Sequence, residues 1–316
     1  MDLCLIHTGG TIGMARTPRG YAPKAGLVEA EVARLIARHE LRAEVEIARL
    51  DPLIDSANAT PADWTRIAEA IAARHDAAKG FVVTHGTDTL AHTAAALAFA
   101  LEGLARPVIV TGAMRPLGET GSDGPRNLSD ALDTALLAPP GVWVQFAGRR
   151  LHGARVRKSH SSADDAFTAA DEARPPRVSG PKLTLHPYRA PEIGILTMAP
   201  GVSGRLVAAA LELCDGLVLR CYGSGTVPDL PQLRDGLMAA RAAGKPVIAV
   251  SQAPQGRLAL GTYAAGALLV EAGVADGADM SVEAAYAKLA HVLSRDLGPE
   301  DRHAMLARPL CGEASL

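Results

Sequence analysis

Short apolar runs alternate with amphipathic stretches along most of the chain. The runs are rich in Val, Ile and Leu and are nearly continuous, which is typical of strands buried on both faces of a parallel sheet. We therefore predict strands at Leu3–His7, Gly80–Thr84, Pro107–Thr111, Val142–Phe146, Ile193–Thr197, Gly216–Arg220 and Pro246–Ser251.

The stretches between these runs have the spacing of helices that bury one face. In "NATPADWTRIAEAIAARHD", Thr60 is placed to cap a helix and Pro61 suits its first position. One face of that helix then carries Trp64, Ile67, Ala68 and Ile71. Such alternation of strands and helices predicts right-handed βαβ units, and hence an α/β protein built as three-layer α/β/α sandwiches.

A proline-containing stretch, "SGPKLTLHPYRAPEIG", interrupts the alternation. Pro187 and Pro191 disfavour regular structure before a new strand begins at Ile193. We predict a larger N-terminal α/β domain with a mostly parallel sheet over residues 1–185, a linker over 186–192 and a smaller α/β domain over 193–316. The length of 316 residues suits two domains, because single cores stop growing near about 250–300 residues.

Composition and charge exclude several classes of partner. Lys and Arg number 32 against 34 Asp and Glu, so the formal net charge of −2 offers no basic footprint for nucleic acid. No apolar run approaches the roughly 20 residues that span a bilayer, and "MDLCLIHTGG" lacks the basic region of a signal peptide. The four cysteines form no CxxC pair and the ten histidines show no metal-ligand spacing. We expect a cytoplasmic protein without a metal site or a membrane partner.

Hydroxyl and glycine residues gather where three strands are predicted to end. "HTGGTIG" follows the first strand, "THGTDT" the second and "TGAMRPLGETGSDG" the third. In open α/β sheets, ligands bind in the loops at the carboxyl ends of the strands. These three loops are therefore predicted to line one crevice.

Three interpretations of the first turn are open on these residues alone. The turn could cradle a phosphate, although it matches neither G-x-G-x-x-G nor GxxxxGK[ST]. It could simply let a strand turn into a helix. It could also present Thr11 as a nucleophile, since adjacent glycines let a substrate approach the backbone and their amides can stabilise an oxyanion. A threonine nucleophile needs a neighbouring base, such as a lysine.

The order of the motifs resembles that of the bacterial-type L-asparaginases. "TGGTIG" is followed by "GYAP", then by "HGTDT", and then by "RVRKSH…DAF". The chain is similar above all to the cytoplasmic type I members, and the similarity extends through "PVIVTGAMRPL", "YGSGTVP" and "GADMSVEAAYAKL" to essentially the whole chain. The resemblance implies hydrolysis of L-asparagine to L-aspartate and ammonia through a β-aspartyl ester. It also implies a smaller domain that is flavodoxin-like, no cofactor, and a homodimer or homotetramer with its site at a subunit interface.

The resemblance implies roles for particular residues. Thr11 would be the primary nucleophile, on a loop that runs to about Tyr21, and Tyr21 would position or activate it. Lys158 would draw the proton from Thr87, and Asp88 would hold the α-amino group of the substrate. In the family, the tyrosine side of the site receives an acidic partner from a neighbouring subunit, and the sequence does not place that residue.

The resemblance also implies a substrate pocket. Ser56 would bind the α-carboxylate of the substrate. Secreted members usually carry Ser-Gln-Asp where this chain has Ser56-Ala57-Asn58, so one side-chain contact to the substrate is lost. The residues predicted to contact the substrate are Gly10, Asp55, Ser56, Gly86, Thr87, Asp88 and Ala113.

Other interpretations stay open beside this one. Lys158 could be an ordinary exposed lysine of the basic stretch "GRRLHGARVRKSH", and Asp88 could cap a helix. The enzyme could act on both asparagine and glutamine, because one methylene is worth only roughly 1–3 kcal/mol in a pocket. The chain could also be a non-catalytic amino-acid sensor, but a sensor is expected to lose Thr11 or Lys158 first, and both are present. Allosteric activation by asparagine, as in some cytoplasmic relatives, is left open as well.

Overall fold

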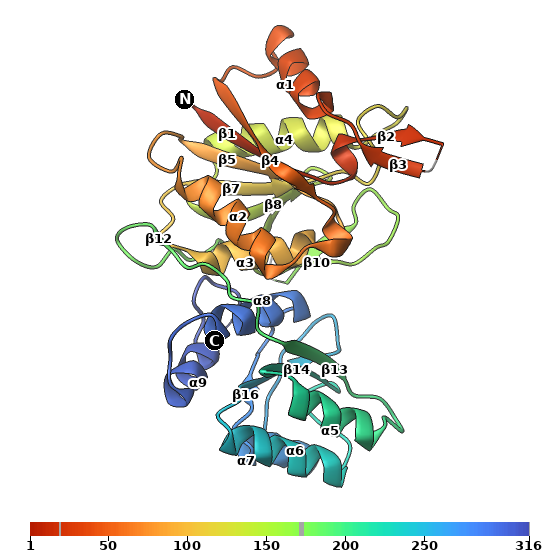
Figure 1. The fold of residues 1–316 in the computed structure, drawn as a ribbon, viewed down its shortest axis with the longest axis vertical. Coiled ribbons are helices and arrows are strands. Elements are labelled where there is room, and N and C mark those ends of the chain that lie inside the picture. The colour runs from red at the N-terminus through yellow and green to blue at the C-terminus, as the bar shows by residue number, and fades with distance from the viewer. Residues whose placement is uncertain (19, 171–173, 316) are drawn as a thin grey trace. The chain divides into compact units, whose positions relative to one another are not determined.

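A computed structural model describes residues 1–18, 20–170 and 174–315 of the chain. The chain divides into two compact units, Met1–Pro187 and Tyr188–Leu316 (Figure 1). Each unit is a sheet between helices, as the alternation of apolar and amphipathic stretches predicts. No helix in the described ranges is long and apolar enough to cross a membrane.

The first unit is built on a six-stranded sheet with the strand order β4-β1-β5-β7-β8-β9. All neighbouring pairs are parallel except β8 and β9, which are antiparallel. The strands are β1 (Leu3–Gly9), β4 (Val45–Ile54), β5 (Gly80–Thr84), β7 (Pro107–Thr111), β8 (Gly141–Phe146) and β9 (Arg149–His152).

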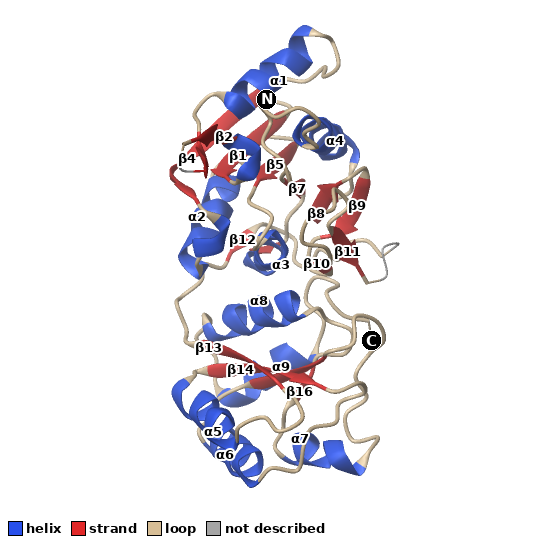
Figure 2. Ribbon diagram, turned by 90° about the vertical axis from the view of Figure 1, so that its right-hand side faces the viewer, coloured by secondary structure: helices blue, strands red, loops and turns tan. Residues whose placement is uncertain are grey.

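Helices cover both faces of this sheet (Figure 2). The helices α1 (Leu27–Ala37) and α4 (Gly124–Leu137) lie on one face, and α2 (Pro61–Ala72) and α3 (Leu90–Ala100) lie on the other. The α2 helix begins as the sequence predicts, because the Asp63 carboxylate accepts a hydrogen bond from the Thr60 backbone amide at 2.9 Å and closes a capping box. Its buried residues are Trp64, Ile67, Ala68 and Ile71, which confirms the predicted face.

Short elements complete the first unit. A 3₁₀ turn, η1 (Thr11–Gly13), follows β1 and leads into the hairpin of β2 (Met14–Thr17) and β3 (Gly20–Pro23). A second 3₁₀ turn, η2 (Ser56–Asn58), follows β4. Two further antiparallel pairs join β6 (Leu101–Glu102) with β12 (Thr184–Leu185), and β10 (Val156–Lys158) with β11 (Phe167–Ala169).

The strand β4 was not predicted from the sequence. Its sequence, VEIARLDPLI, mixes charged residues with a proline and lacks the continuous apolar run of the other strands. The reason is its place at the edge of the sheet, where most of its residues stay partly or fully exposed. A proline such as Pro52 is tolerated on an edge strand because one row of backbone amides has no partner there.

The second unit contains a four-stranded parallel sheet with the order β13-β14-β15-β16. Its strands are β13 (Ile193–Thr197), β14 (Gly216–Cys221), β15 (Val247–Ser251) and β16 (Ala275–Asp276). The helices α5 (Gly204–Leu213) and α6 (Pro231–Ala242) pack on one face and α8 (Val282–Leu293) on the other (Figure 2). The unit is completed by η3 (Ala264–Gly266), α7 (Ala267–Glu271) and α9 (Pro299–Ala307).

The predicted strands are all present, with ends that differ by at most two residues. The prediction of burial on both faces holds for β1, β5, β7 and β8, every residue of which is buried. It is wrong for β13, in which Ile195 is 45% exposed. This strand forms an edge of its sheet, so its apolar sequence does not report burial on two faces.

Candidate active site

Three of the loops at the carboxyl edge of the first sheet converge. The strands β1, β5 and β7 are direct neighbours and run parallel, so the loops that follow them leave the sheet at the same edge. The first loop contains Thr11 in η1, the second contains Thr87 and Asp88 before α3, and the third covers residues 112–123 before α4. This is the arrangement that the sequence predicts.

The two Thr–Gly turns touch through their glycines. A methyl group on Gly10 would lie 2.4 Å from the Gly86 amide nitrogen, which leaves no space for any other residue. Gly10 also has φ of 85°, a value that favours glycine. A methyl group on Gly86 would lie 2.3 Å from the Ser56 hydroxyl oxygen. Gly10, Gly86 and Ser56 are therefore in contact, and Thr11 and Thr87 each directly follow one of the two glycines.

A layer of buried hydrogen bonds lies under these turns. The Thr8 hydroxyl donates to the Thr84 carbonyl oxygen, and the His7 Nδ1 lies 2.7 Å from the Thr84 hydroxyl oxygen. The His85 Nδ1 donates to the Gly86 carbonyl oxygen at 2.8 Å, and its Nε2 lies 3.1 Å from the Thr93 hydroxyl oxygen. Burial lowers the pKa of His85 below its ordinary value, so this ring is held neutral and braces the second turn.

Lys158 joins Thr87 and Asp88 in a second cluster. The Lys158 Nζ lies 3.0 Å from the Thr87 hydroxyl oxygen and 3.0 Å from the Asp88 Oδ1. Lys158 ends the strand β10, where it pairs with Phe167 of β11, and its side chain is 21% exposed. It is therefore not the solvated surface lysine that its basic sequence context allowed. The Asp88 carboxylate is 63% exposed and is the solvent-facing member of the cluster.

The residues after β4 complete one wall of the site. Ser56 is buried at 5% exposure, and its backbone carbonyl accepts a hydrogen bond from the Thr89 hydroxyl at 2.7 Å. The Asp55 carboxylate is committed to its own turn, since it accepts hydrogen bonds from the Ala57 amide and the Asn58 side chain. Ala113 is fully buried after β7. Contact of Asp55 and Ala113 with the substrate stays a prediction.

Tyr21 lies on the β2–β3 hairpin, and its hydrogen bond goes to a residue outside the lysine cluster. Its side chain is 50% exposed, and its hydroxyl donates to the Glu119 Oε1 at 3.4 Å. In the part of the chain that the structure describes, the Thr11 side chain makes no hydrogen bond. No local sequence pattern marks Glu119, although its loop, "TGAMRPLGETGSDG", is one of the three that are predicted to line the crevice.

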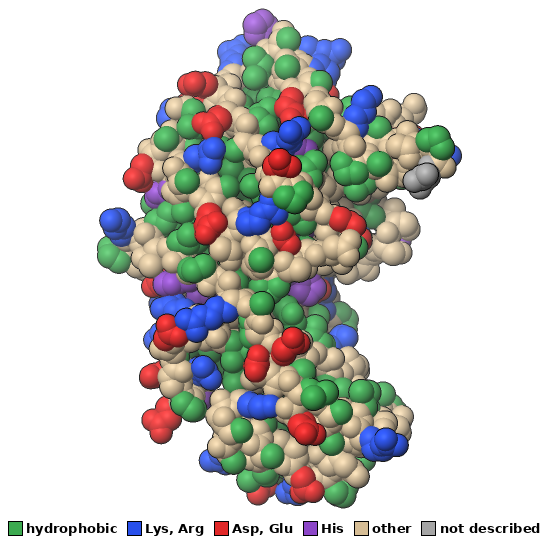
Figure 3. Space-filling view, in the orientation of Figure 1, with side chains coloured by type: hydrophobic (Ala, Val, Ile, Leu, Met, Phe, Trp, Pro, Cys, Tyr) green, Lys and Arg blue, Asp and Glu red, His purple; other side chains and the backbone are tan. Residues whose placement is uncertain are grey.

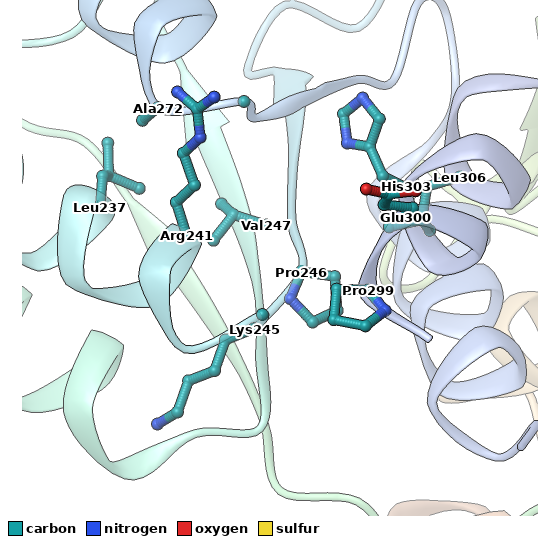
Figure 4. A pocket seen from close by; sticks show the side chains of 12 residues that line it. Leu237, Arg241, Lys245, Pro246, Val247, Ala272, Pro299, Glu300, His303 and Leu306 are labelled. Carbon is teal, nitrogen blue, oxygen red and sulfur yellow. The ribbon is translucent and has the colours of Figure 1, made fainter. Parts of the chain in front are cut away.

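A cavity of about 500 Å³ lies elsewhere, within the second unit (Figure 4). It is lined by the end of α6, the start of β15 and the start of α9, with Arg241 and His303 among its polar side chains. The Arg241 guanidinium is already bonded to the Glu271 carbonyl oxygen. None of the predicted site residues lines this cavity.

Charge and metal-binding groups give no competing site in the described ranges. Acidic and basic side chains are interspersed on the face shown in Figure 3. No group of three or more His, Cys, Asp or Glu side chains among the described residues is arranged to hold a metal ion. The candidate reactive groups are the hydroxyls of Thr11 and Thr87, the Lys158 amine and the Asp88 carboxylate, because the Gly10–Gly86 contact and the Lys158 hydrogen bonds bring them to one edge of the first sheet.

An α/β protein with paired Thr–Gly turns and a Thr–Lys–Asp cluster has the groups that an acyl-transfer enzyme requires. The chain belongs to the asparaginase family: residues 2–189 match the model described as "Asparaginase, N-terminal", and residues 192–306 match "Glutaminase/Asparaginase C-terminal domain". These matches confirm the predicted resemblance, the predicted fold class and the assignment to an asparaginase-type hydrolase.

Similar proteins match along the full length of the chain. L-asparaginase 1 of Escherichia coli is 39% identical over 99% of this chain and 97% of its own length. The L-asparaginase of Thermococcus kodakarensis is 35% identical over 99% of both chains. The solved structure of L-asparaginase I from Vibrio cholerae is 34% identical, with a TM-score of 0.89 over 100% of this chain and 99% of that one.

Proposed function

We propose that this chain hydrolyses L-asparagine to L-aspartate and ammonia with Thr11 as the nucleophile. The proposal is supported by relatives named L-asparaginase that match the chain from end to end. The observation that carries it is the contact between Gly10 and Gly86, which brings the turn of Thr11 against the turn of Thr87, whose hydroxyl lies 3.0 Å from Lys158.

The site suits a zwitterionic amino acid. The exposed Asp88 carboxylate is a partner for the α-ammonium group of the substrate, and charge-assisted hydrogen bonds of this kind are strong. The Ser56 hydroxyl, beside the Gly86 backbone, is a partner for the α-carboxylate. These two contacts would place the side-chain amide of the substrate between them and the Thr11 turn.

The proposed chemistry has two halves. The Thr11 oxygen forms a bond to the amide carbon and gives up its proton, the C–N bond breaks, and the nitrogen leaves with that added proton as ammonia. Thr11 then carries a β-aspartyl ester. Water adds to the ester carbon, the Thr11 oxygen leaves and regains a proton, and L-aspartate is released. In this scheme Lys158 accepts and returns a proton through Thr87, and Tyr21 positions the Thr11 hydroxyl.

Glutamine is the alternative substrate with an observation in its favour. The family model that matches the second unit covers glutaminases as well as asparaginases. Glutamine is longer by one methylene, and a pocket distinguishes such a difference by only roughly 1–3 kcal/mol. Ala57 replaces the Gln side chain of the secreted relatives, so the pocket has one contact fewer with which to discriminate.

The test is the initial rate of ammonia release against L-asparagine concentration, from micromolar to tens of millimolar, with L-glutamine in parallel. Release from asparagine at a higher kcat/KM than from glutamine would support the proposal. A hyperbolic curve would indicate independent sites, and a sigmoidal curve would indicate activation at a second asparagine site. Release from neither amide would overturn the enzyme assignment and favour the amino-acid sensor.

Replacing the nucleophile gives the sharpest single variant. Thr11→Ala is expected to lower kcat by about a thousandfold or more, as loss of a nucleophile does in other acyl-transfer enzymes. The fold should survive, because Thr11 is only half-buried and its side chain bonds to no other described residue. Circular dichroism and thermal unfolding check the fold, and Thr262→Ala, at an exposed threonine of the second unit, is the matched control. Wild-type turnover in Thr11→Ala would exclude this nucleophile.

We further propose a cytoplasmic location. All four cysteines are free thiols in the structure, and burial raises the pKa of Cys4 to about 11 and that of Cys221 to about 12. Free, buried thiols are typical of proteins from a reducing compartment. Fractionation of cells that produce the protein would test this, and recovery outside the cytoplasm would contradict it.

A further inference from the structure

We propose that Glu119 is the acidic partner of Tyr21 within the same chain and is a positioning residue for the reaction. The proposal rests on the asparaginase function proposed above. It identifies a group of this chain in a place for which the resemblance implies a residue from a neighbouring subunit.

The first support is the contact itself. The Tyr21 hydroxyl donates to the Glu119 Oε1 at 3.4 Å across 98 positions of sequence. Glu119 is the one carboxylate among the described residues that contacts this hydroxyl. Tyr21 is half-exposed on a two-stranded hairpin, and such hairpins are marginally stable by themselves. A fixed partner is therefore needed to hold the phenol in one place.

The second support is the way the hairpin continues from the nucleophile turn. The β2 strand starts at Met14, directly after η1, and the Lys24 amide donates to the Gly13 carbonyl oxygen at 2.9 Å to close the base of the hairpin. A displacement of Tyr21 is therefore expected to displace the turn that contains Thr11. A contact that fixes the position of Tyr21 also helps to fix the position of Thr11.

The third support is the order of the loop that presents Glu119. The Asp123 carboxylate accepts hydrogen bonds from the Met114 amide at 2.8 Å and the Arg115 amide at 2.9 Å, which closes the loop at its base. The Glu119 amide donates to the Pro116 carbonyl oxygen, and the Glu119 carbonyl accepts from the Ser122 amide, both at 3.1 Å. Glu119 is thus carried by consecutive hydrogen-bonded turns and is not at the tip of a loose loop.

The same loop touches both halves of the site. The Leu117 amide donates to the Ile12 carbonyl oxygen at 3.4 Å, which is a second tie to the Thr11 turn. The Arg115 guanidinium bonds to the Asp164 carboxylate at 2.7 Å, in the segment that follows Lys158. The 112–123 loop therefore braces the nucleophile turn against the lysine side, and Glu119 is its contact with Tyr21.

Chemistry gives the contact a purpose. A carboxylate that accepts a hydrogen bond from the phenol fixes the direction of the O–H group. The lone pairs of the phenol oxygen then face away from the carboxylate and can accept a hydrogen bond from a donor on the substrate side. Hydrogen bonds at catalytic sites are often long without substrate and tighten in the complex, so 3.4 Å is compatible with this role. Misplacement of a reacting group by about 1 Å can cost about 100-fold in rate.

The test compares kcat and KM for L-asparagine in wild type, Tyr21→Phe, Glu119→Gln, Glu119→Asp and the double variant Tyr21→Phe/Glu119→Gln. Glu119→Gln is expected to lower kcat by about 10- to 100-fold with little change in KM, and Glu119→Asp to recover part of the loss. The double variant should be no slower than the slower single variant, because the two residues act as a unit. Glu69→Gln, on the exposed face of α2, is the control for loss of one carboxylate.

Two outcomes would overturn the proposal. One is a kcat for Glu119→Gln within twofold of wild type, and the other is a double variant whose loss is the product of the two single losses. Hydrogen exchange over residues 14–24 tests the role of Glu119 separately from the proposed asparaginase function. Faster exchange in Glu119→Gln than in Glu69→Gln would show that Glu119 holds the hairpin, whereas equal exchange would refute it even if the wild type releases no ammonia.

Discussion

Two substitutions of Lys158 distinguish a role for its positive charge from a role in proton transfer. Lys158→Met is expected to lower kcat nearly as far as Thr11→Ala, because it removes the group 3.0 Å from the Thr87 hydroxyl. Lys158→Arg keeps a positive charge beside Asp88 but cannot give up a proton, so it should be almost as inactive. Steady-state ammonia release measures both, with circular dichroism as the check on folding. An arginine variant with most of the wild-type kcat would show that charge alone suffices.

His85 and His7 make stability depend on pH. Burial lowers the pKa of both rings below the ordinary 6.5, so the folded state prefers them neutral. Their contribution is present above about pH 6.5 and is lost as the pH falls from there toward the lowered pKa values. We expect the thermal midpoint to drop between about pH 7.5 and about pH 5.5, and to drop less in His85→Gln. An equal drop in both proteins would place the acid sensitivity elsewhere.

The site residues differ in how far sequence could place them. Thr11, Thr87 and Asp88 follow predicted parallel strands, so the topology rule alone brings their loops together. Lys158 needed the resemblance, because its basic context is typical of a surface. Glu119 could not be found, since its partner lies 98 positions away and no local pattern links an acid in a turn to a tyrosine in a hairpin.

At the scale of elements, a strand could be predicted from the sequence where it is buried. The strands β1, β5, β7 and β8 are fully buried, so each carries an apolar run that predicts it. The edge strand β4 has no such run, and the short pairs β10–β11 and β6–β12 depend on partners distant in sequence. The helix α2 could be predicted to its first residue because its capping box and proline are local signals.

The final segment of the chain is tied to α8 by a buried ion pair. The Lys288 Nζ lies 2.8 Å from the Glu313 Oε1, and both side chains are at most 1% exposed. Lys288 also donates to the Leu306 and Arg308 carbonyl oxygens, and Glu313 accepts from the Leu310 and Cys311 amides. The pair therefore fixes the segment after α9 through both of its members.

Removing one member should be costly. Glu313→Gln keeps the shape but leaves the Lys288 charge buried without its partner, and such changes cost about 3–5 kcal/mol. The double variant Lys288→Met/Glu313→Gln should recover much of that loss, because no unpaired charge remains. Urea unfolding, monitored by hydrogen exchange over residues 188–315, measures the free energy of unfolding of the wild type and of each variant. A loss below about 1 kcal/mol in Glu313→Gln would mean that solvent reaches the pair and screens it.

At the scale of the whole molecule, each unit has its own core. One cluster joins buried side chains of β1, β5, β7, α1 and α4 within the first unit, and another joins those of β14, β15, α5 and α6 within the second. The sequence could predict two α/β units because each core is built from its own set of consecutive strands and helices. It could not predict the association of chains, since that depends on surfaces.

Assembly is the prediction that belongs to the whole molecule. The family resemblance implies a homodimer or homotetramer, and the second unit exposes apolar side chains that water does not favour. Leu206 and Leu213 of α5 are 57% and 75% exposed, and their spacing of seven residues puts them on one face of the helix. Ile195 of the edge strand β13 is also exposed. A second copy of this chain is the occupant that we expect for this face.

Light scattering should therefore give a mass of two or four times 32.7 kDa for the wild type. The double variant Leu206→Glu/Leu213→Glu should shift the mass toward that of one chain or weaken assembly on dilution, because it places charges in the apolar contact. Leu137→Glu is the matched control, since Leu137 ends α4 in the first unit and is 83% exposed. A monomeric wild type would contradict assembly itself. An unchanged mass in the α5 variant would instead move the interface to another face.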